Sequence, residues 1–275
     1  MIYSPKAMKQ ILEDNEFSFK KKFGQNFIID ENIINNIIKA ADLDKDTLVI
    51  EIGPGAGSLT SKLAASAGFV LCYEIDKTLK EILSDNLKNY NNVEIIYNDF
   101  LKQNIKEDLT KYNYSKVCVV ANLPYYITTP IVTKIIDDQI EINKMVIMVQ
   151  KEVGDRFKAE PNSKDYGSLS VFLNYYFDIK KELDVSKNVF IPKPNVDSVV
   201  VTLTKKNNRK ICKNEDILFK LIRDAFKQKR KNLRNNLREY DLEKIEKTLT
   251  KYGYDLTARA EQISLDIYID IADNL

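Results

Sequence analysis

The chain has 275 residues, of which 44% are hydrophobic, and this is enough for one large core and a small second domain. Its 42 basic residues nearly cancel its 40 acidic ones, so the net charge of +2 does not by itself indicate nucleic-acid binding. The absence of histidine excludes histidine bases, Ser-His-Asp triads and histidine-ligated zinc. No run approaches the ~18 apolar residues of a membrane span, and the polar N-terminus does not resemble a signal peptide. We therefore expect a soluble, intracellular protein without membrane contact or bound metal.

Strand-like and helix-like segments alternate through the first half of the sequence. In chain order they are a helix at 33–41, a strand at 47–52, a helix at 59–67, a strand at 69–74, a helix at 77–87, strands at 93–97 and 117–121, a helix at 130–138 and a strand at 145–150. This alternation predicts an α/β domain with a parallel sheet. Cys72, Cys118 and Cys212 are far apart and odd in number, and we interpret them as small buried core residues.

The pattern changes in the second half. Segments 168–177 and 196–204 are rich in β-formers, so we expect them to close the sheet as an antiparallel pair. No strand candidate follows Lys205, and residues 215–240 have helical periodicity. The sequence therefore predicts a ligand-binding α/β domain at 1–205 and a small helical domain at 206–275.

A glycine-rich turn follows the first predicted strand. Glycine allows positive φ and a close approach of the backbone to a ligand, and Gly53, Gly55 and Gly57 are spaced G-x-G-x-G. The dinucleotide fingerprint is G-x-G-x-x-G, so the spacing disfavours a dehydrogenase. Taken alone, the motif could also be an ordinary tight turn.

Acidic residues follow the next two strands. Glu74 ends the second strand, where a carboxylate can hold both ribose hydroxyls of a nucleoside ligand. Asp99 and Phe100 follow the third, where a carboxylate can accept from an adenine amine and a ring can pack on the base. Either acid could instead be a solvated loop residue, but three successive strand ends with suitable chemistry favour a nucleoside-binding site.

The fourth strand ends in Asn122-Leu123-Pro124-Tyr125. An adenine N6 amine is a poor nucleophile because its lone pair is delocalised into the ring. The Asn122 side-chain oxygen and the Leu123 carbonyl could hold its two hydrogens and direct the lone pair toward a methyl donor. Pro124 would stiffen the loop, and Tyr125 offers a stacking face for an extruded base. The alternative is a polar turn after a strand.

These residues closely resemble the ribosomal RNA adenine dimethyltransferases, which methylate two adjacent adenines near the 3′ end of small-subunit rRNA. The matching segments occur in the family's order and are 23–28, 51–55, 74–76, 98–100, 122–125, 150–153, 166–170, 190–198 and 225–231. The resemblance implies a Rossmann-like methyltransferase domain and S-adenosylmethionine as cofactor. It further implies cofactor contacts at Asn26, Ile28, Gly53, Glu74, Asp99 and Asn122. Asn195 departs from the lysine that we would expect before Val196, which weakens an RNA contact there.

Basic residues concentrate behind the predicted α/β domain. Residues 205–238 contain 13 basic and three acidic residues, so the rest of the chain is net acidic. Such segregation is suited to phosphate contacts, although a solvated helix face is the alternative. We predict RNA contacts at Lys227, Lys229, Arg230, Lys231 and Arg234. Lys22, in the Lys20-Lys21-Lys22 run, is a further candidate.

Two other functions remain open at this point. A methyltransferase that acts on large-subunit rRNA and confers antibiotic resistance would share the fold, but such enzymes more often carry isoleucine where Leu123 stands. A non-catalytic RNA-binding assembly factor would be expected to lack the cofactor glycines or Asn122, and both are present. We therefore expect a cytoplasmic, monomeric enzyme of ribosome biogenesis that acts on small-subunit rRNA within an assembling subunit.

Overall fold

The computed structural model describes residues 5–15, 17–20 and 23–275. They form two compact units, Met1–Gly154 with Lys180–Thr204, and Asp155–Ile179 with Lys205–Leu275. The chain therefore passes between the units more than once. The last passage lies between Thr204 and Lys205, one residue before the boundary that we expected, whereas the inclusion of 155–179 in the second unit has no counterpart in the sequence analysis.

In chain order the main elements are α1 (Pro5–Asp14), β1 (Phe27–Ile28), α2 (Glu31–Ala41), β2 (Thr47–Ile52), α3 (Ser58–Ser66), β3 (Phe69–Tyr73), α4 (Lys80–Leu87), β4 (Val93–Ile96), α5 (Ile105–Leu109), β5 (Lys116–Asn122), α6 (Thr128–Asp137), β6 (Lys144–Gln150), α7 (Lys151–Phe157), α8 (Ser168–Tyr176), β7 (Phe177–Val185), β8 (Phe190–Ile191), β9 (Ser198–Lys205), α9 (Glu215–Ala225), α10 (Leu233–Asn236), α11 (Leu242–Thr250) and α12 (Leu265–Asn274). The short 3₁₀ helices η3 (Phe100–Lys102) and η4 (Tyr125–Ile127) follow β4 and β5. Every helix and strand expected before residue 150 is present, with its ends displaced by a few residues at most.

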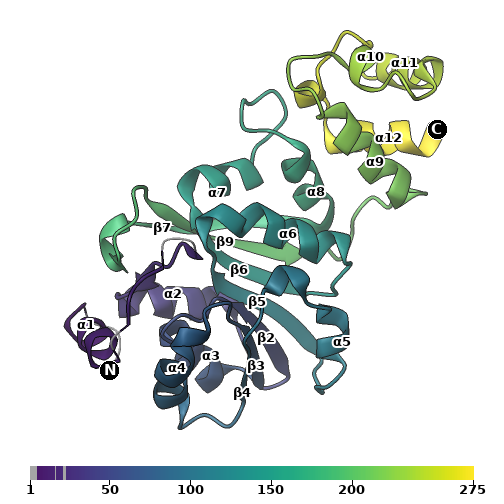
Figure 1. Cartoon of the computed structure of the whole chain (residues 1–275). Coiled ribbons are helices and arrows are strands. Elements are labelled where there is room, and N and C mark those ends of the chain that lie inside the picture. Colours follow the sequence, from purple (N-terminus) through teal and green to yellow (C-terminus); the bar gives the residue numbers. More distant parts are fainter. Residues whose placement is uncertain (1–4, 16, 21–22) are drawn as a thin grey trace. The chain divides into compact units, whose positions relative to one another are not determined.

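The first unit is built on a seven-stranded sheet with the order β4-β3-β2-β5-β6-β9-β7 (Figure 1). The neighbouring strands from β4 to β6 are parallel, and β9 pairs antiparallel with β6. The predicted α/β fold is therefore confirmed. A separate two-stranded ribbon pairs β1 with β8 in antiparallel orientation.

The central strands are buried on both faces, as expected for a parallel sheet covered by helices. All six residues of β2 are buried, and Ile34 and Ile37 of α2 pack with Leu59 and Leu63 of α3 in one apolar cluster over the sheet. The helix α2 begins at a favourable cap, because the Asp30 side chain accepts hydrogen bonds from two backbone amides of its first turn. This rigid layer fixes the carboxyl ends of the strands.

Segment 168–177, which we expected to be a strand, forms the helix α8 as far as Tyr176, and only Phe177 belongs to a strand, so that expectation was wrong. The Ser170 hydroxyl donates to the Arg156 carbonyl at 2.7 Å and accepts from the Gly167 backbone amide at 3.2 Å, which supports the first turn of the helix. The aromatic side chains then pack on another helix, since Phe172 and Tyr175 lie edge-on to Phe219 of α9, with ring centroids 5.4 and 5.6 Å apart. Helix–helix packing outweighs the β-propensity of this segment. The sheet is closed instead by β9, which pairs antiparallel with β6, and by β7 next to it at the edge.

The second unit has its own core, formed by α8 to α12. The helical region expected at 215–240 is divided into α9 and α10 by a turn at residues 226–232. Asparagine side chains stabilise this break: Asn232 caps α10 by accepting from the Asn235 amide, and Asn236 donates to the Ala225 carbonyl at 2.6 Å. Such local bonds offer the backbone an alternative to a continuous helix.

Candidate active site

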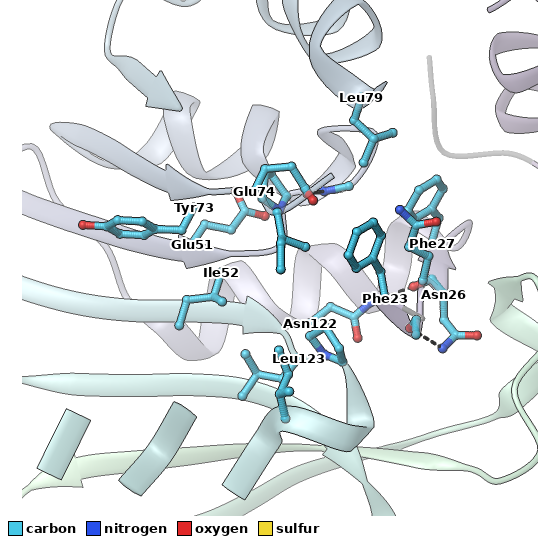
Figure 2. A pocket seen from close by; sticks show the side chains of 18 of the residues that line it. Phe23, Asn26, Phe27, Glu51, Ile52, Tyr73, Glu74, Leu79, Asn122 and Leu123 are labelled. Carbon is cyan, nitrogen blue, oxygen red and sulfur yellow. Dashed lines mark hydrogen bonds between the residues drawn. The ribbon is translucent and has the colours of Figure 1, made fainter. Parts of the chain in front are cut away.

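A pocket opens at the carboxyl ends of the parallel strands of the first unit (Figure 2). After β2 the chain moves outward through β3 to β4 and then returns to place β5 on the other side of β2. Ligands of open α/β sheets bind at such a reversal of strand order. The pocket encloses about 950 Å³, including its open mouth, and is lined by the segments that follow β2, β3, β4 and β5 together with residues 23–28.

The glycine turn after β2 forms the floor of the pocket. Gly53 and Gly55 have φ of 73° and 60°, in the left-handed region that favours glycine. A Cβ on Gly55 would lie 2.9 Å from the Phe27 ring, whereas a Cβ on Gly53 would meet nothing within 4 Å. The Gly53 backbone is therefore accessible from the pocket, and Gly55 allows the strap at residues 23–28 to lie close to the turn.

Two buried carboxyl groups, Glu51 and Glu74, line the pocket side by side (Figure 2). Glu74 is 4% exposed and accepts hydrogen bonds from the backbone amides of Asp76, at 2.8 Å, and Gly55, at 3.2 Å. Burial raises the pKa of Glu74 to about 7, and these two amides oppose the rise. Burial also raises the pKa of Glu51 to about 8. The sequence analysis predicted Glu74 but did not assign Glu51 to the site.

Asp99 and Phe100 lie at the start of η3, on another side of the same pocket. Asp99 caps η3 by accepting from the Leu101 backbone amide at 3.0 Å, which fixes its carboxylate at the end of β4. The Phe100 ring is buried and lies edge-on to Tyr73, with centroids 5.3 Å apart. The residues expected to contact a base are therefore brought together with Glu74.

The Asn122 side chain has a defined orientation. Its amide nitrogen donates to the Asn26 backbone carbonyl at 2.8 Å. A backbone carbonyl can only accept, so the Asn122 atom bonded to it must be the side-chain nitrogen. The side-chain oxygen of Asn122 is therefore directed away from this bond. Leu123 follows with its side chain buried and its backbone amide bonded to the Met148 carbonyl at 3.1 Å. Within the described residues, no hydrogen bond to the Leu123 carbonyl is found.

Two adjacent tyrosines line the pocket after Pro124. Tyr125 is half-buried, and its hydroxyl lies 2.6 Å from the hydroxyl of Ser198, which is fully buried on β9. Burial raises the pKa of Tyr125 above its usual value. Tyr126 is 54% exposed and its ring lies next to Gly24 of the strap, where an added Cβ would come within 3.1 Å of it. The predicted stacking residue Tyr125 is thus anchored at its polar end, and Tyr126 presents a second aromatic face that the sequence analysis did not assign.

The strap at residues 23–28 covers one side of the pocket. Asn26 lines the pocket, and its side-chain nitrogen donates to the Gly24 carbonyl at 3.0 Å. Ile28 lies in the β1–β8 ribbon with its side chain buried. Before the strap, the Lys20 ammonium lies 2.6 Å from an oxygen of Asp76. This lysine is therefore engaged in an ion pair, while Lys22, the predicted RNA contact, lies outside the described residues.

The remaining predicted RNA contacts lie on the surface of the second unit. Lys227, Lys229, Arg230, Lys231 and Arg234 are all exposed, on the turn between α9 and α10 and on α10 itself. Lys229 donates to the Lys164 carbonyl at 2.7 Å, and Arg234 lies 3.6 Å from a carboxylate oxygen of Glu246. Ion pairs and hydrogen bonds of such exposed groups are weak, so these cations remain available to an anionic partner.

The three cysteines are buried, as expected. Among residues 5–15, 17–20 and 23–275, there is no cluster of three or more cysteine and acidic side chains that could hold a metal ion. Helices in this part of the chain are too short or too polar to span a bilayer.

Sequence reasoning missed several residues because their partners are remote in the chain. Glu51 could have been suspected, since it is an acidic residue inside an apolar strand. Gln25, Asp76 and Ser198 stand within segments that match the family, but their roles could not be assigned, because these depend on contacts with residues far away in the sequence.

Comparisons with known proteins point to one family. Residues 16–275 match the family model described as ribosomal RNA adenine dimethylase. The chain is 48% identical over 273 residues, covering 96% of this chain and 92% of the relative, to a ribosomal RNA small subunit methyltransferase A of Staphylococcus aureus (strain bovine RF122 / ET3-1).

Two solved structures are similar over most of the chain. A dimethyladenosine transferase from Plasmodium falciparum superposes with a TM-score of 0.73 at 24% identity, covering 89% of this chain and 95% of that one. The 23S rRNA methyltransferase ErmE superposes with a TM-score of 0.70 at 26% identity, covering 91% of this chain and 99% of that one.

Proposed function

The chain belongs to the ribosomal RNA adenine dimethylase family, and from this premise we propose that it transfers methyl groups from S-adenosylmethionine to the N6 amines of two adjacent adenines near the 3′ end of small-subunit rRNA. The observation that carries the proposal is the orientation of Asn122. Its amide nitrogen is bound to the Asn26 carbonyl, so its oxygen is left to accept from a substrate amine.

The charge of the pocket is suited to S-adenosylmethionine, which carries a sulfonium cation and no phosphate. The pocket contains the carboxyl groups of Glu51, Glu74 and Asp99, and none of its described lining residues is a lysine or arginine. The lining offers no cationic side chain to a pyrophosphate, and those of its carboxyl groups that are ionised would repel a pyrophosphate and attract a cation. The open space above Gly53 gives the ligand access to the backbone of the turn. The residues present therefore fit this cofactor.

Each predicted cofactor contact has a distinct role in this proposal. Glu74 would accept from the ribose hydroxyls, Asp99 would accept from the adenine amine, and Phe100 would pack on the base. Asn26 would hydrogen-bond the methionine end of the cofactor, while the other contacts, Ile28, Gly53 and Gly55, would line its pocket. When bound, the cofactor supplies an electrophilic methyl group.

The protein's contribution to methyl transfer is orientation. The Asn122 oxygen and the Leu123 carbonyl would accept the two hydrogens of the N6 amine and direct its lone pair into the pocket. The ring of Tyr125, held through its hydroxyl by Ser198, would stack on the extruded base. No strong general base is needed, since the amine becomes acidic once methylated, and this agrees with a chain that contains no histidine.

RNA binding would rest on the second unit. Its exposed cations, Lys227, Lys229, Arg230, Lys231 and Arg234, would contact phosphates in a sequence-independent manner. Residues 206–275, which belong to this unit, would thus act as a helical RNA-binding domain, and the first unit would be the methyltransferase domain expected within 1–205. We further propose that the protein acts as a monomer in the cytoplasm, on rRNA within an assembling small subunit.

The proposal is tested by incubating the full-length protein with labelled S-adenosylmethionine and, separately, with small and large ribosomal subunits that lack the modification. We expect label only in the small-subunit rRNA, at two adjacent adenines near its 3′ end, which primer extension or mass spectrometry would map. Label in large-subunit rRNA would favour the resistance-type activity, and subunit binding without transfer would favour a non-catalytic assembly factor. Either result would overturn the proposal.

A further inference from the structure

A polar network attaches the strap to the loop after β3. Asp76 is 1% exposed, and its carboxylate accepts from the Lys20 ammonium at 2.6 Å and from the Gln25 side-chain amide at 2.8 Å. The other end of the Gln25 side chain accepts from the Lys20 backbone amide at 2.9 Å. Gln25 therefore bridges the strap to Asp76 with both of its polar atoms engaged, which leaves it a single orientation.

The next residue in the chain is the one that holds Asn122. The Asn26 carbonyl, directly after Gln25, accepts from the Asn122 amide nitrogen at 2.8 Å (Figure 2). Asp76 is thus connected to Asn122 by a hydrogen bond to the Gln25 side chain, by the covalent backbone from Gln25 to Asn26, and by the hydrogen bond between the Asn26 carbonyl and Asn122. Any displacement of the Gln25 backbone would also displace the acceptor that orients the Asn122 amide.

Apolar contacts already hold the strap on the rest of the unit. Phe27 packs in a buried cluster with Leu79 and Leu83, and Phe27 and Ile28 also pair with β8. These contacts are enough to keep the strap in place, but they are not directional. The charged and amide groups around Asp76 add directionality, which a hydrogen-bonding catalytic group requires to within a fraction of an ångström.

We propose that Gln25 and Asp76, supported by Lys20, are positioning residues that fix the Asn26 carbonyl and thereby aim the Asn122 oxygen at the substrate amine. This inference rests on the proposed function, because it takes Asn122 as the acceptor of that amine. It assigns a role to the Gln25 and Asp76 positions of the motifs Phe23-Gly24-Gln25-Asn26 and Glu74-Ile75-Asp76, which the cofactor contacts alone do not explain.

The test compares Gln25→Leu and Lys20→Met with the control Lys62→Met in the full-length protein. The Lys62 ammonium lies 2.7 Å from Glu31, neither residue lines the pocket, and the Lys62 side chain is 31% exposed, as is that of Lys20. Lys20→Arg serves as the conservative variant that keeps the charge on Asp76. Thermal unfolding of each variant checks that the fold is retained.

The first measurement is the single-turnover rate at saturating S-adenosylmethionine and saturating small subunits. In Gln25→Leu a misplaced acceptor should lower this rate by about 10-fold to 100-fold. The loss should be smaller in Lys20→Met, and Lys20→Arg should recover the wild-type rate. The control Lys62→Met should show no change. If the network served only to close the strap over the cofactor, the cofactor KM would rise while the saturated rate stayed within about twofold of wild type. That result would overturn the inference.

The second measurement does not depend on activity. In protein labelled with ¹⁵N-asparagine, the Asn122 side-chain amide signal is identified by its loss in Asn122→Ala. Its hydrogen exchange should accelerate about tenfold or more in Gln25→Leu and remain unchanged in Lys62→Met. Unchanged exchange in both Gln25→Leu and Lys20→Met would overturn the inference. A wild-type protein that fails to methylate small subunits would instead refute the proposed function, since the exchange measurement reports the Asn122 position by itself.

Discussion

The pocket of the first unit and the turn between α9 and α10 of the second unit differ in charge, burial and rigidity. The pocket groups are carboxylates and amides that are held by hydrogen bonds from elements fixed by the sheet. The turn instead carries exposed lysines and arginines on long side chains. A rigid acidic site is suited to a cationic cofactor. Long cationic side chains are suited to a polyanion, because contacts to its phosphates do not depend on the base sequence.

This difference leads to different consequences of mutation. A change in the pocket should alter one step, such as cofactor affinity or methyl transfer, by a large factor, because each group has a fixed partner. A change in the turn should weaken RNA binding gradually and in a salt-dependent way.

Replacing Asn122 should give the largest effect. Asn122→Ala removes the acceptor aimed at the amine, and removal of a preorganised polar group of this kind lowers the rate by about 10²–10³-fold. Single-turnover methylation at saturating cofactor and RNA measures this decrease, and RNA affinity and thermal stability serve as controls. Wild-type turnover in Asn122→Ala would refute the proposed mechanism.

Glu74→Ala should weaken cofactor binding. Each charge-assisted hydrogen bond that the variant cannot form is worth about 1.5–3 kcal/mol, and about 1.4 kcal/mol corresponds to a factor of ten in affinity. Calorimetric titration measures the change, with Glu31→Ala as a control because Glu31 lies on α2 in a pair with Lys62. An unchanged affinity in a folded Glu74→Ala protein would remove Glu74 from the cofactor site.

Tyr125→Phe tests the anchored ring. It keeps the stacking face but leaves the buried Ser198 hydroxyl without its partner, so the free energy of unfolding should fall by about 1–3 kcal/mol. Adding Ser198→Ala removes the second polar group and should restore part of this stability. Tyr125→Ala should be slower than Tyr125→Phe, because a stacking face is worth about 1–3 kcal/mol. Equal inactivity of the two variants would indicate that the phenol acts in proton transfer.

Cofactor affinity should rise with pH near neutrality. Burial raises the pKa of Glu74 to about 7 in the free protein, so below this pH the group is largely neutral and accepts more weakly from ribose hydroxyls. As the pH rises through about 7 the carboxylate ionises, and the affinity should increase several-fold, by less than the tenfold that one pH unit allows for one proton. Titrations at pH 6 and 8 test this, and Glu74→Gln should lack the part of the dependence that is due to Glu74, which leaves only the part due to Glu51, whose pKa burial raises to about 8.

The basic turn should give the smallest effect per residue. Neutralising Lys229, Arg230 and Lys231 should reduce the slope of log affinity against log salt by about 0.7–0.9 for each phosphate that the variant no longer neutralises. Cofactor affinity should remain at the wild-type value, because no residue of the turn lines the pocket. An unchanged slope would show that these cations only form a solvated face.

Much of the candidate site could be predicted from the sequence because it lies at strand ends. Gly53, Glu74, Asp99 and Asn122 lie at or just after the end of strands that local pattern alone identifies, and in a parallel sheet these ends meet at one edge. The orientation of Asn122 could not be predicted, because its partner carbonyl is 96 residues away. The anchoring of Tyr125 depends likewise on Ser198, 73 residues away.

By itself, the sequence determined the α/β alternation, the position of the pocket and the charges of its groups, since these depend on local periodicity and on residue type. Only the tertiary structure decided that residues 168–176 form a helix, because aromatic packing on Phe219 outweighs their β-propensity. It also decided which atom of Asn122 is free to accept, because directional bonds between distant residues exist only once the chain has folded.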